Sequence, residues 1–313
     1  ILTLLGGCAA QAEKEQEQEE PSVPVAYDGP IIDVHLHSFP EGSPMYGKTH
    51  PTTLRGESYQ GVTSREQQMR ETLAKMEEHN IVKAVVGGGK SWKELAPDKI
   101  LVGGDEEMSI DFLRKAYEAG NLNVMAEMAP FYGQILANDP VLTPVFDLAD
   151  ELGIPVGFHV LPGGPNGGLY SFPEMLPGMR AVNAHPMQIE EVLVAHPDMK
   201  VYLMHGGWPF VEEVKALMYM HPQLYVDVAV INWILPEKEF HKYLADLIDA
   251  GFGDRIMYGT DQMVWPEVMD LGIDAVNSAP ITDQQKADIF YNNAADFFGL
   301  SEQEIAAHKS MTE

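Results

Sequence analysis

Eight short apolar runs rich in valine and isoleucine alternate with amphipathic stretches from residue 31 onward, and this alternation limits the possible folds more than any other feature of the chain. Such runs are typical of strands in a parallel sheet, and the stretches between them are typical of the helices that cover it. Because eight strand–helix units close a barrel, we predict an α/β fold, a (β/α)8 TIM barrel in a single domain. The runs cover residues 31–37, 81–89, 100–106, 122–130, 154–160, 200–207, 224–230 and 256–262.

Two connections between these runs are unusually long. Residues 38–62 follow the first run and residues 161–185 follow the fifth, so both lie on the strand-to-helix side, which is the catalytic side of such barrels. A capping-box pair, Ser64 and Gln67, predicts a helix start after the first long connection. The alternative architecture is a doubly wound open sheet, but no glycine-rich nucleotide-binding motif follows the first run.

The composition excludes several classes of function. The 313 residues include 47 acidic and 20 basic ones, a formal charge of −27, which repels phosphate backbones and anionic lipid headgroups. We therefore expect no nucleic-acid partner. A single cysteine can form neither an internal disulfide nor a cysteine-based metal site, so a metal would have to be held by carboxylates and by some of the 11 histidines.

The ends of the chain differ from its body. Residues 1–8 resemble the end of a truncated bacterial lipoprotein signal peptide, with LGGC as the lipobox and Cys8 as the lipidation site; a buried core cysteine is the alternative. The glutamate-rich residues 9–30 predict a disordered acidic tether. We therefore expect an exported lipoprotein that faces the periplasm or the cell exterior and contacts the membrane only through its anchor. The barrel would occupy residues 31–300, and a C-terminal tail residues 301–313.

Side chains of the kind that bind metals gather at the predicted carboxyl ends of the strands. His35 and His37 lie two apart on the first strand, so both project to the same face, into the barrel. Alone, this pair fits structural histidines as well as ligands. His159, His205 and Asp261 end the fifth, sixth and eighth runs, and keeping five unpaired polar groups at one buried mouth would be costly. Imidazoles with one carboxylate suit Zn²⁺ or another divalent first-row ion better than an all-oxygen Ca²⁺ or Mg²⁺ site does.

At these residues the sequence resembles the amidohydrolase superfamily, in particular its amidohydrolase-related branch of TIM-barrel metal-dependent hydrolases and decarboxylases. The resemblance covers residues 31–300, essentially the whole predicted barrel. The motif YNNA (291–294) looks like the family's last helix. The motifs are IDVHLH (32–37), GFH (157–159), MHGGWP (204–209), YGTDQ (258–262) and YNNA (291–294).

The resemblance implies a role for each of these polar residues. His35, His37 and His159 would hold the metal. Asp261 would be a ligand or a proton acceptor, and His205 would bind a second ion or activate the metal-bound water. The chemistry is reasonable by itself: a metal lowers the pKa of bound water from about 15.7 toward about 7, and an adjacent base takes the proton as hydroxide adds to an electrophilic carbon.

Strand four departs from the family's pattern. Many members carry there a carboxylated lysine that bridges two metals, whereas this chain has Glu127 within VMAEMA. Glu127 would either replace that lysine as a bridging ligand or orient a ligand from outside the coordination shell. A register shift of one residue would instead turn it away from the pocket. The site could therefore hold one or two ions.

Three functions fit these observations. The first is a metal-dependent hydrolase of a small amide, lactone or ester-like substrate, with zinc as the expected ion and manganese or another first-row ion as alternatives. The second keeps the site but decarboxylates or hydrates an unsaturated acid, as the same branch does. The third, a non-catalytic metal-binding lipoprotein, is disfavoured because no residue of the implied ligand set is missing. A homo-oligomer is compatible with each.

Aromatic residues follow several strand ends and either wall a substrate pocket or pack the rim of the barrel. Lys90 is the only cation directly after a strand end and is a candidate contact for a substrate carboxylate. The aromatic residues are Trp208, Trp233, Trp265, Tyr132 and Tyr170.

Overall fold

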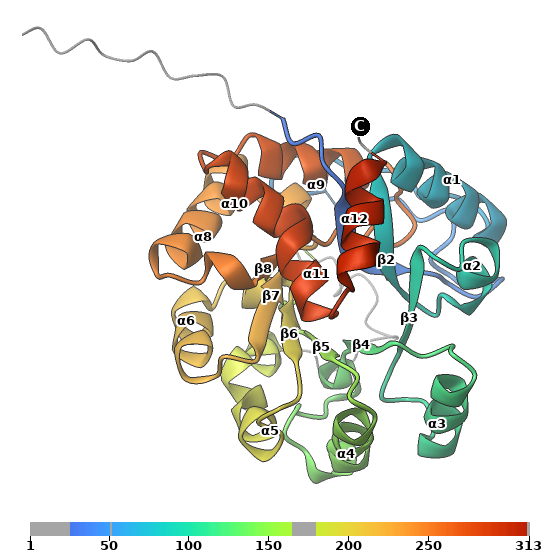
Figure 1. Cartoon of the computed structure of the whole chain (residues 1–313), viewed down its shortest axis with the longest axis vertical. Coiled ribbons are helices and arrows are strands. Elements are labelled where there is room, and N and C mark those ends of the chain that lie inside the picture. Colours follow the sequence, from blue (N-terminus) through green and yellow to red (C-terminus); the bar gives the residue numbers. More distant parts are fainter. Residues whose placement is uncertain (1–25, 51, 165–179, 312–313) are drawn as a thin grey trace, which may run out of the picture.

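The computed structural model describes residues 26–50, 52–164 and 180–311, which form the predicted (β/α)8 barrel (Figure 1). The eight strands are parallel and pair in chain order from β1 to β8. The strands are β1 (Ile31–His37), β2 (Ile81–Gly87), β3 (Ile100–Gly104), β4 (Val124–Met128), β5 (Val156–His159), β6 (Val201–Met204), β7 (Leu224–Asp227) and β8 (Ile256–Met257).

Hydrogen bonds between β1 and the chain at and beyond β8 bring the two ends of the sheet together. Val34 N donates to Tyr258 O at 3.0 Å, and Asp261 N donates to His35 O at 2.7 Å. These bonds leave the barrel nearly closed. They also tie the loop after β8 directly to the strand that carries the histidine pair.

Each predicted run contains a strand, but most strands end earlier than the runs suggest. His205 lies just after β6 and Asp261 lies beyond the two-residue β8, with backbone φ angles of 61° and 55°. A residue in this left-handed region does not continue a pleated strand, so the chain turns at both positions. His159, in contrast, is the last residue of β5, as predicted.

The helices surround the strands (Figure 1). Ser64 caps α1 as predicted, accepting from Gln67 N at 3.1 Å, but the Gln67 side chain accepts from Thr63 N instead of closing the box on Ser64. Among the described residues, none of the helices has the length and hydropathy needed to cross a bilayer. The helices are α1 (Arg65–Glu78), α2 (Lys90–Leu95), α3 (Ile110–Glu118), α4 (Thr143–Leu152), α5 (Glu190–Ala195), α6 (Val211–Met220), α7 (Ile231–Ile234), α8 (Glu237–Asp249), α9 (Val268–Asn277), α10 (Asp283–Ala287), α11 (Asn293–Phe297) and α12 (Glu302–Ser310).

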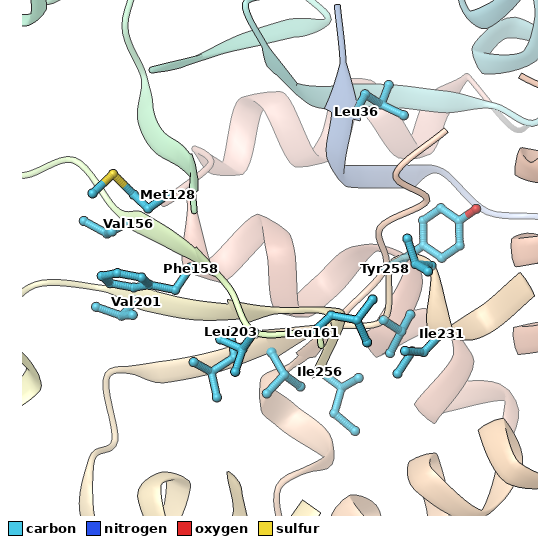
Figure 2. Packing of buried hydrophobic residues seen from close by; sticks show 14 of the residues in the cluster. Leu36, Met128, Val156, Phe158, Leu161, Val201, Leu203, Ile231, Ile256 and Tyr258 are labelled. Atoms are coloured by element: carbon cyan, nitrogen blue, oxygen red, sulfur yellow. The ribbon is translucent and has the colours of Figure 1, made fainter. Parts of the chain in front are cut away.

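The core between strands and helices follows from the alternation of side chains along each strand. Figure 2 shows Val156 and Phe158 of β5 near Val201 and Leu203 of β6, their register partners, and all four are buried. Burying each such side chain stabilises the fold by about 1.5–3 kcal/mol. Because successive residues point to opposite faces, this packing leaves His159 to face the barrel interior.

The segments that flank the barrel are packed against it where the structure describes them. Cys8 and the tether as far as residue 25 lie outside the described residues, but Tyr27 stacks on Phe290 with ring centroids 5.1 Å apart. The expected C-terminal tail instead contains α12, which begins with a capping box formed by Ser301 and Glu304. That local signal stabilises the helix start, and tertiary contacts then hold the helix across the amino-terminal end of the barrel.

Candidate metal centre

Glu127 lies at the centre of a cluster of imidazoles at the carboxyl end of the barrel. Its Oε1 atom is 3.3 Å from His205 Nε2 and contacts His159 Nδ1, and its Oε2 atom is 3.3 Å from His37 Nε2. His35 Nε2 is 3.9 Å from Oε1. Of the alternatives for Glu127, the register that turns it away from the pocket is therefore wrong. The pairing of β4 with β5 shifts between Met125 and Met128, an irregularity that alternation alone does not predict.

Asp261 approaches the same cluster from the loop after β8. Its Oδ1 atom is 3.1 Å from His37 Nε2 and 3.9 Å from His35 Nε2. The Asp261 backbone is held by the bond from its N–H to His35 O. The six residues singled out from the sequence, four histidines and two acids, thus meet at one place.

These six residues form overlapping sets of three with the spacing that a metal ion needs. In each set, one nitrogen or oxygen atom per residue lies within 4.8 Å of the others. Two of the sets share Glu127. The sets are His35, His37 and Glu127; Glu127, His159 and His205; and His35, His205 and Asp261.

Two buried atoms support the fit of this donor set to a cation. In the part of the chain that the structure describes, neither His35 Nε2 nor Asp261 Oδ1 has an aligned hydrogen-bond partner. Leaving such atoms buried and unsatisfied is costly, by about 1–3 kcal/mol for each. A divalent ion between them would satisfy a nitrogen lone pair and a carboxylate oxygen together, and mixed nitrogen and oxygen donors suit first-row ions.

The electrostatics of the cluster are dominated by its two carboxylates. Burial alone would lower the pKa of His37, but Asp261 and Glu127 raise it to about 10. Likewise, Glu127 outweighs burial and raises the pKa of His205 to about 9. Burial opposes the charge on the two acids as well, yet the nearby imidazoles hold the pKa of Glu127 well below, and that of Asp261 below, the ordinary value. Two ionised acids within one cluster attract positive charge, whether protons or a metal.

His159 presents Nδ1 to the cluster because its other nitrogen is engaged elsewhere. His159 Nε2 lies 3.1 Å from the Tyr132 hydroxyl and 3.2 Å from Leu161 O. Burial lowers the pKa of this imidazole, so its neutral form is favoured. Tyr132 is thus one predicted aromatic residue that does contact the cluster.

The other residues predicted to line a substrate pocket either pack against the rest of the barrel or are exposed, where the structure describes them. Trp233 and Trp265 are buried and pack edge-on against His50, as the rim-packing interpretation expects. Trp208 is partly buried against the core, and its Nε1 donates to Glu239 at 3.3 Å. Lys90 is exposed as the first residue of α2. Tyr170 lies outside the described residues.

Sequence reasoning missed two residues that hold the histidines in place. Asp227 ends β7 and lies 3.0 Å from His35 Nδ1. Gln262 clamps the backbone of His37, accepting from its N–H at 3.0 Å and donating to its carbonyl at 2.9 Å. A signal was present for both, because Asp227 is the one acid within the run 224–230 and Gln262 belongs to the YGTDQ motif.

Known proteins resemble this chain at low identity. Over 142 residues it is 20% identical to Protein fluG of Emericella nidulans, a match that spans 40% of this chain and only 16% of that relative. A solved structure of a probable 2-pyrone-4,6-dicarboxylic acid hydrolase from Acinetobacter baumannii, with citric acid bound, is 15% identical with a TM-score of 0.62, covering 86% of this chain and 99% of that one. A 5-carboxyvanillate decarboxylase from Novosphingobium aromaticivorans, complexed with manganese and a nitrobenzoic acid, is 14% identical with a TM-score of 0.54, covering 73% and 79%.

These solved structures show that the chain shares their fold. At such low sequence identities they do not assign a reaction or a substrate to it. The sequence profile of a family described as amidohydrolase matches residues 32–300, nearly the whole barrel. Together with the cluster of imidazoles and carboxylates at the barrel mouth, this match leads to one conclusion. The chain belongs to the amidohydrolase family, and the mouth of its barrel carries residues of the kind that hold metal ions.

Proposed function

We propose that the protein is a hydrolase that uses two divalent ions, zinc as our first choice, to act on a small amide, lactone or ester-like substrate. The observation that carries this proposal is the position of Glu127, whose carboxylate contacts His205 through Oε1 and His37 through Oε2. A carboxylate shared by two ligand groups is suited to bridging two ions. Two-ion sites are typical of hydrolytic and phosphoryl-transfer enzymes.

In this proposal the six clustered residues divide into two ligand sets that share Glu127. His35, His37 and Asp261 would hold one ion, and His159 and His205 the other. The metal supplies Lewis-acid chemistry, since it lowers the pKa of water toward about 7 and polarises a carbonyl. His205 is oriented for this role because its Nδ1 lies 3.1 Å from Ala229 O, which favours a proton on Nδ1 and leaves the lone pair of Nε2 facing the cluster.

Asp261 is the proposed proton acceptor. His35 and His37 hold its pKa below the ordinary value, so its carboxylate is ionised at neutral pH. Its Oδ1 atom faces the cluster as the proposed ligand atom, and the other oxygen of the carboxylate would take a proton from the attacking water. The same carboxyl group would then return the proton to the leaving atom of the substrate, as a general base that becomes a general acid.

Decarboxylation, or hydration of an unsaturated acid, is the second candidate function. His35 Nε2 and Asp261 Oδ1 are two buried atoms without an aligned hydrogen-bond partner, and a single ion bound between them would satisfy both. A solved neighbour that contains manganese is a decarboxylase. If only one ion binds, Glu127 orients His159 and His205 from outside the coordination shell, and the hydrolytic proposal loses its main support.

Metal stoichiometry and reaction class test the proposal together. We expect elemental analysis of protein reconstituted with Zn²⁺ or Mn²⁺ to give about two ions per chain, as typical two-metal sites hold. Lactone, amide and ester panels should be hydrolysed without release of CO₂. One ion per chain, with CO₂ released from aromatic or unsaturated acids, would overturn the hydrolytic assignment in favour of the second candidate.

Glu127→Gln provides the sharpest variant for this test. The amide keeps the shape of the side chain but loses the charge that two ions share, so we expect one ion to be lost. Glu106→Gln is the matched control, because Glu106 is a partly buried acid that accepts from Ala129 N at 3.1 Å and faces no imidazole of the cluster in the described structure. Equal metal content in the two variants would contradict a bridging role for Glu127.

We also propose that the protein is exported and lipidated at Cys8. The support lies in the sequence alone, in the LGGC motif followed by a polar, acidic segment. Metabolic labelling of the native protein with a radioactive fatty acid tests this, and Cys8→Ser should abolish the label. Label that survives this substitution would show that Cys8 is not the attachment point.

A further inference from the structure

We propose that Asp227 is a positioning residue that fixes the tautomer of His35 and the backbone of His205, so that both imidazoles turn an unprotonated nitrogen toward the metal centre. This inference rests on the proposed metal site, since it explains how two of the proposed ligands are oriented. The geometry that supports it lies on the side of the cluster opposite to Asp261 and Glu127.

The contacts of Asp227 are those of a buried acceptor. The residue is fully buried, with 0% of its surface exposed. Its Oδ1 atom accepts from His205 N at 2.7 Å and from Ala229 N at 3.0 Å, and its Oδ2 atom is 3.0 Å from His35 Nδ1. A carboxylate has no proton to donate, so His35 must carry its proton on Nδ1.

The tautomer of His35 matters because the acids of the cluster alone would favour a proton on Nε2 rather than on Nδ1. His35 Nε2 lies 3.9 Å from Glu127 Oε1 and 3.9 Å from Asp261 Oδ1. In the absence of a metal, these two acids attract a proton to Nε2, and a proton there would block coordination. Asp227 opposes this by holding the proton on Nδ1. An outer carboxylate that orients a histidine ligand in this way also increases its basicity toward the metal.

Asp227 acts on His205 through the backbone. His205 adopts a left-handed conformation with φ of 61°, which is strained for a residue other than glycine. The bond from His205 N to Asp227 stabilises this turn. Asp227 also holds the N–H of Ala229, the residue whose carbonyl lies 3.1 Å from His205 Nδ1. One carboxylate thus holds the backbone of His205 and the backbone of the residue whose carbonyl faces its Nδ1 atom.

The chain contains a matched control for this residue. Asp33 is also fully buried, and it also accepts two backbone N–H groups, those of His35 at 3.0 Å and Thr260 at 3.1 Å. Its remaining oxygen accepts from the Thr260 hydroxyl, not from an imidazole. A hydroxyl can rotate and accept from an amide, so Asp33→Asn changes a buried acid without dictating a tautomer.

Asp227→Asn is the decisive variant. Its amide oxygen would keep the two backbone donors, which turns the NH₂ group toward His35 Nδ1 and forces the proton of His35 onto Nε2. We expect the affinity for Zn²⁺, measured by competition with a chelator, to fall about 10- to 100-fold, the usual range for loss of an outer carboxylate partner. Nitrogen-15 NMR of the histidine side chains should show His35 changing from the Nδ1–H to the Nε2–H form. We expect Asp33→Asn to lower thermal stability but to retain the wild-type affinity and tautomer.

The same NMR measurement on the metal-free wild-type protein keeps the test decisive even if Asp227→Asn does not fold. His35 should carry a proton on Nδ1, and an Nδ1 atom without a proton would overturn the inference. Unchanged zinc affinity and tautomer in a folded Asp227→Asn variant would overturn it as well. If the wild-type protein binds no metal while His35 carries its proton on Nδ1, the proposed function fails and the role of Asp227 in setting the tautomer stands.

Discussion

The two ends of the barrel use charged residues in opposite ways. At the amino-terminal end two lysines have simple partners: Lys83 pairs with Glu304 at 3.3 Å, and the Lys200 ammonium donates to the carbonyls of Asp296 and Phe297. At the carboxyl end, Glu127 is surrounded by several imidazoles that compete for it. The first arrangement stabilises the fold, whereas the second leaves buried atoms unsatisfied until a cation arrives.

This difference shows where the fold gives up stability for function. Buried polar atoms without partners destabilise the metal-free protein, and a ligand that binds only the folded state compensates by mass action, by about 4 kcal/mol at a thousand times its dissociation constant. The Lys83–Glu304 ion pair and the Tyr291–His308 hydrogen bond at the amino-terminal end need no ligand, because each group is satisfied by a side chain of the protein itself. Substitutions at the two ends should therefore differ in whether they affect activity or stability.

The largest effect is expected for His37→Ala at the carboxyl end. His37 Nε2 contacts both acids of the cluster, so its loss removes a proposed ligand and the partner of Asp261. We expect kcat/KM to fall by at least about a thousandfold, because metal catalysis supplies several kcal/mol of transition-state stabilisation. Lys83→Met at the amino-terminal end is the control, and its kcat/KM should match that of the wild type. Comparable losses in both variants would remove the functional distinction between the two ends.

Asp261→Asn should have the next largest effect. An amide can still face the cluster but cannot take up a proton, so kcat should fall about 100- to 10,000-fold, the range for loss of a general base. Elemental analysis should show whether metal is retained. A wild-type kcat in a metal-loaded variant would exclude Asp261 as the proton acceptor.

The sequence was sufficient to predict the barrel and, at its mouth, the four histidines and Asp261, because strand alternation and strand ends are local signals. It could not establish the direction of Glu127, which depends on an irregular pairing between β4 and β5. It also placed His205 and Asp261 on strands, whereas left-handed backbone at both positions puts them in the turns beyond. Asp227 was missed because its importance depends on a contact with His35, 192 positions away in the chain. Periodicity does not encode such contacts.

A pair of glycine substitutions compares the two ends by stability. Gly206 follows His205 with φ of 60°, and a Cβ there would lie 2.1 Å from the Tyr243 hydroxyl oxygen. Gly153, which ends α4 near the amino-terminal end of the barrel, has φ of 63° but open space around it. Chemical denaturation should show Gly206→Ala destabilised by about 2–4 kcal/mol, since it adds a clash to backbone strain, and Gly153→Ala by about 1 kcal/mol. Equal losses would show that backbone strain alone, and not crowding beside His205, determines the effect.

Tyr291→Phe should affect stability without affecting catalysis. The Tyr291 hydroxyl lies 2.9 Å from His308 Nδ1 and joins the chain before α11 to the last helix. Loss of this hydrogen bond should lower the free energy of unfolding by about 1 kcal/mol. Activity at a temperature well below the unfolding transition is the companion measurement, and a lower kcat there would mean that the amino-terminal end is coupled to the site.

The smallest effect concerns the pH dependence of stability at the amino-terminal end. Hydrogen bonds from the Ser301 backbone and hydroxyl, together with Lys83, lower the pKa of Glu304 to about 2. Because the folded pKa is lower than the unfolded value of about 4.3, this carboxylate stabilises the protein above about pH 4.3, and the contribution is lost as the pH falls toward 2. Its side chain is 46% exposed, so solvent screening should keep the contribution below about 1 kcal/mol.

Glu304→Gln should therefore be less stable than the wild type at neutral pH, and urea denaturation should show the difference in unfolding free energy shrinking as the pH falls. Glu302→Gln, which removes a charge from the same helical turn, should not reproduce this change. A difference that grew toward low pH would mean that the charge of Glu304 opposes the docking of α12, and the amino-terminal end would then resemble the carboxyl end more than its ion pairs suggest.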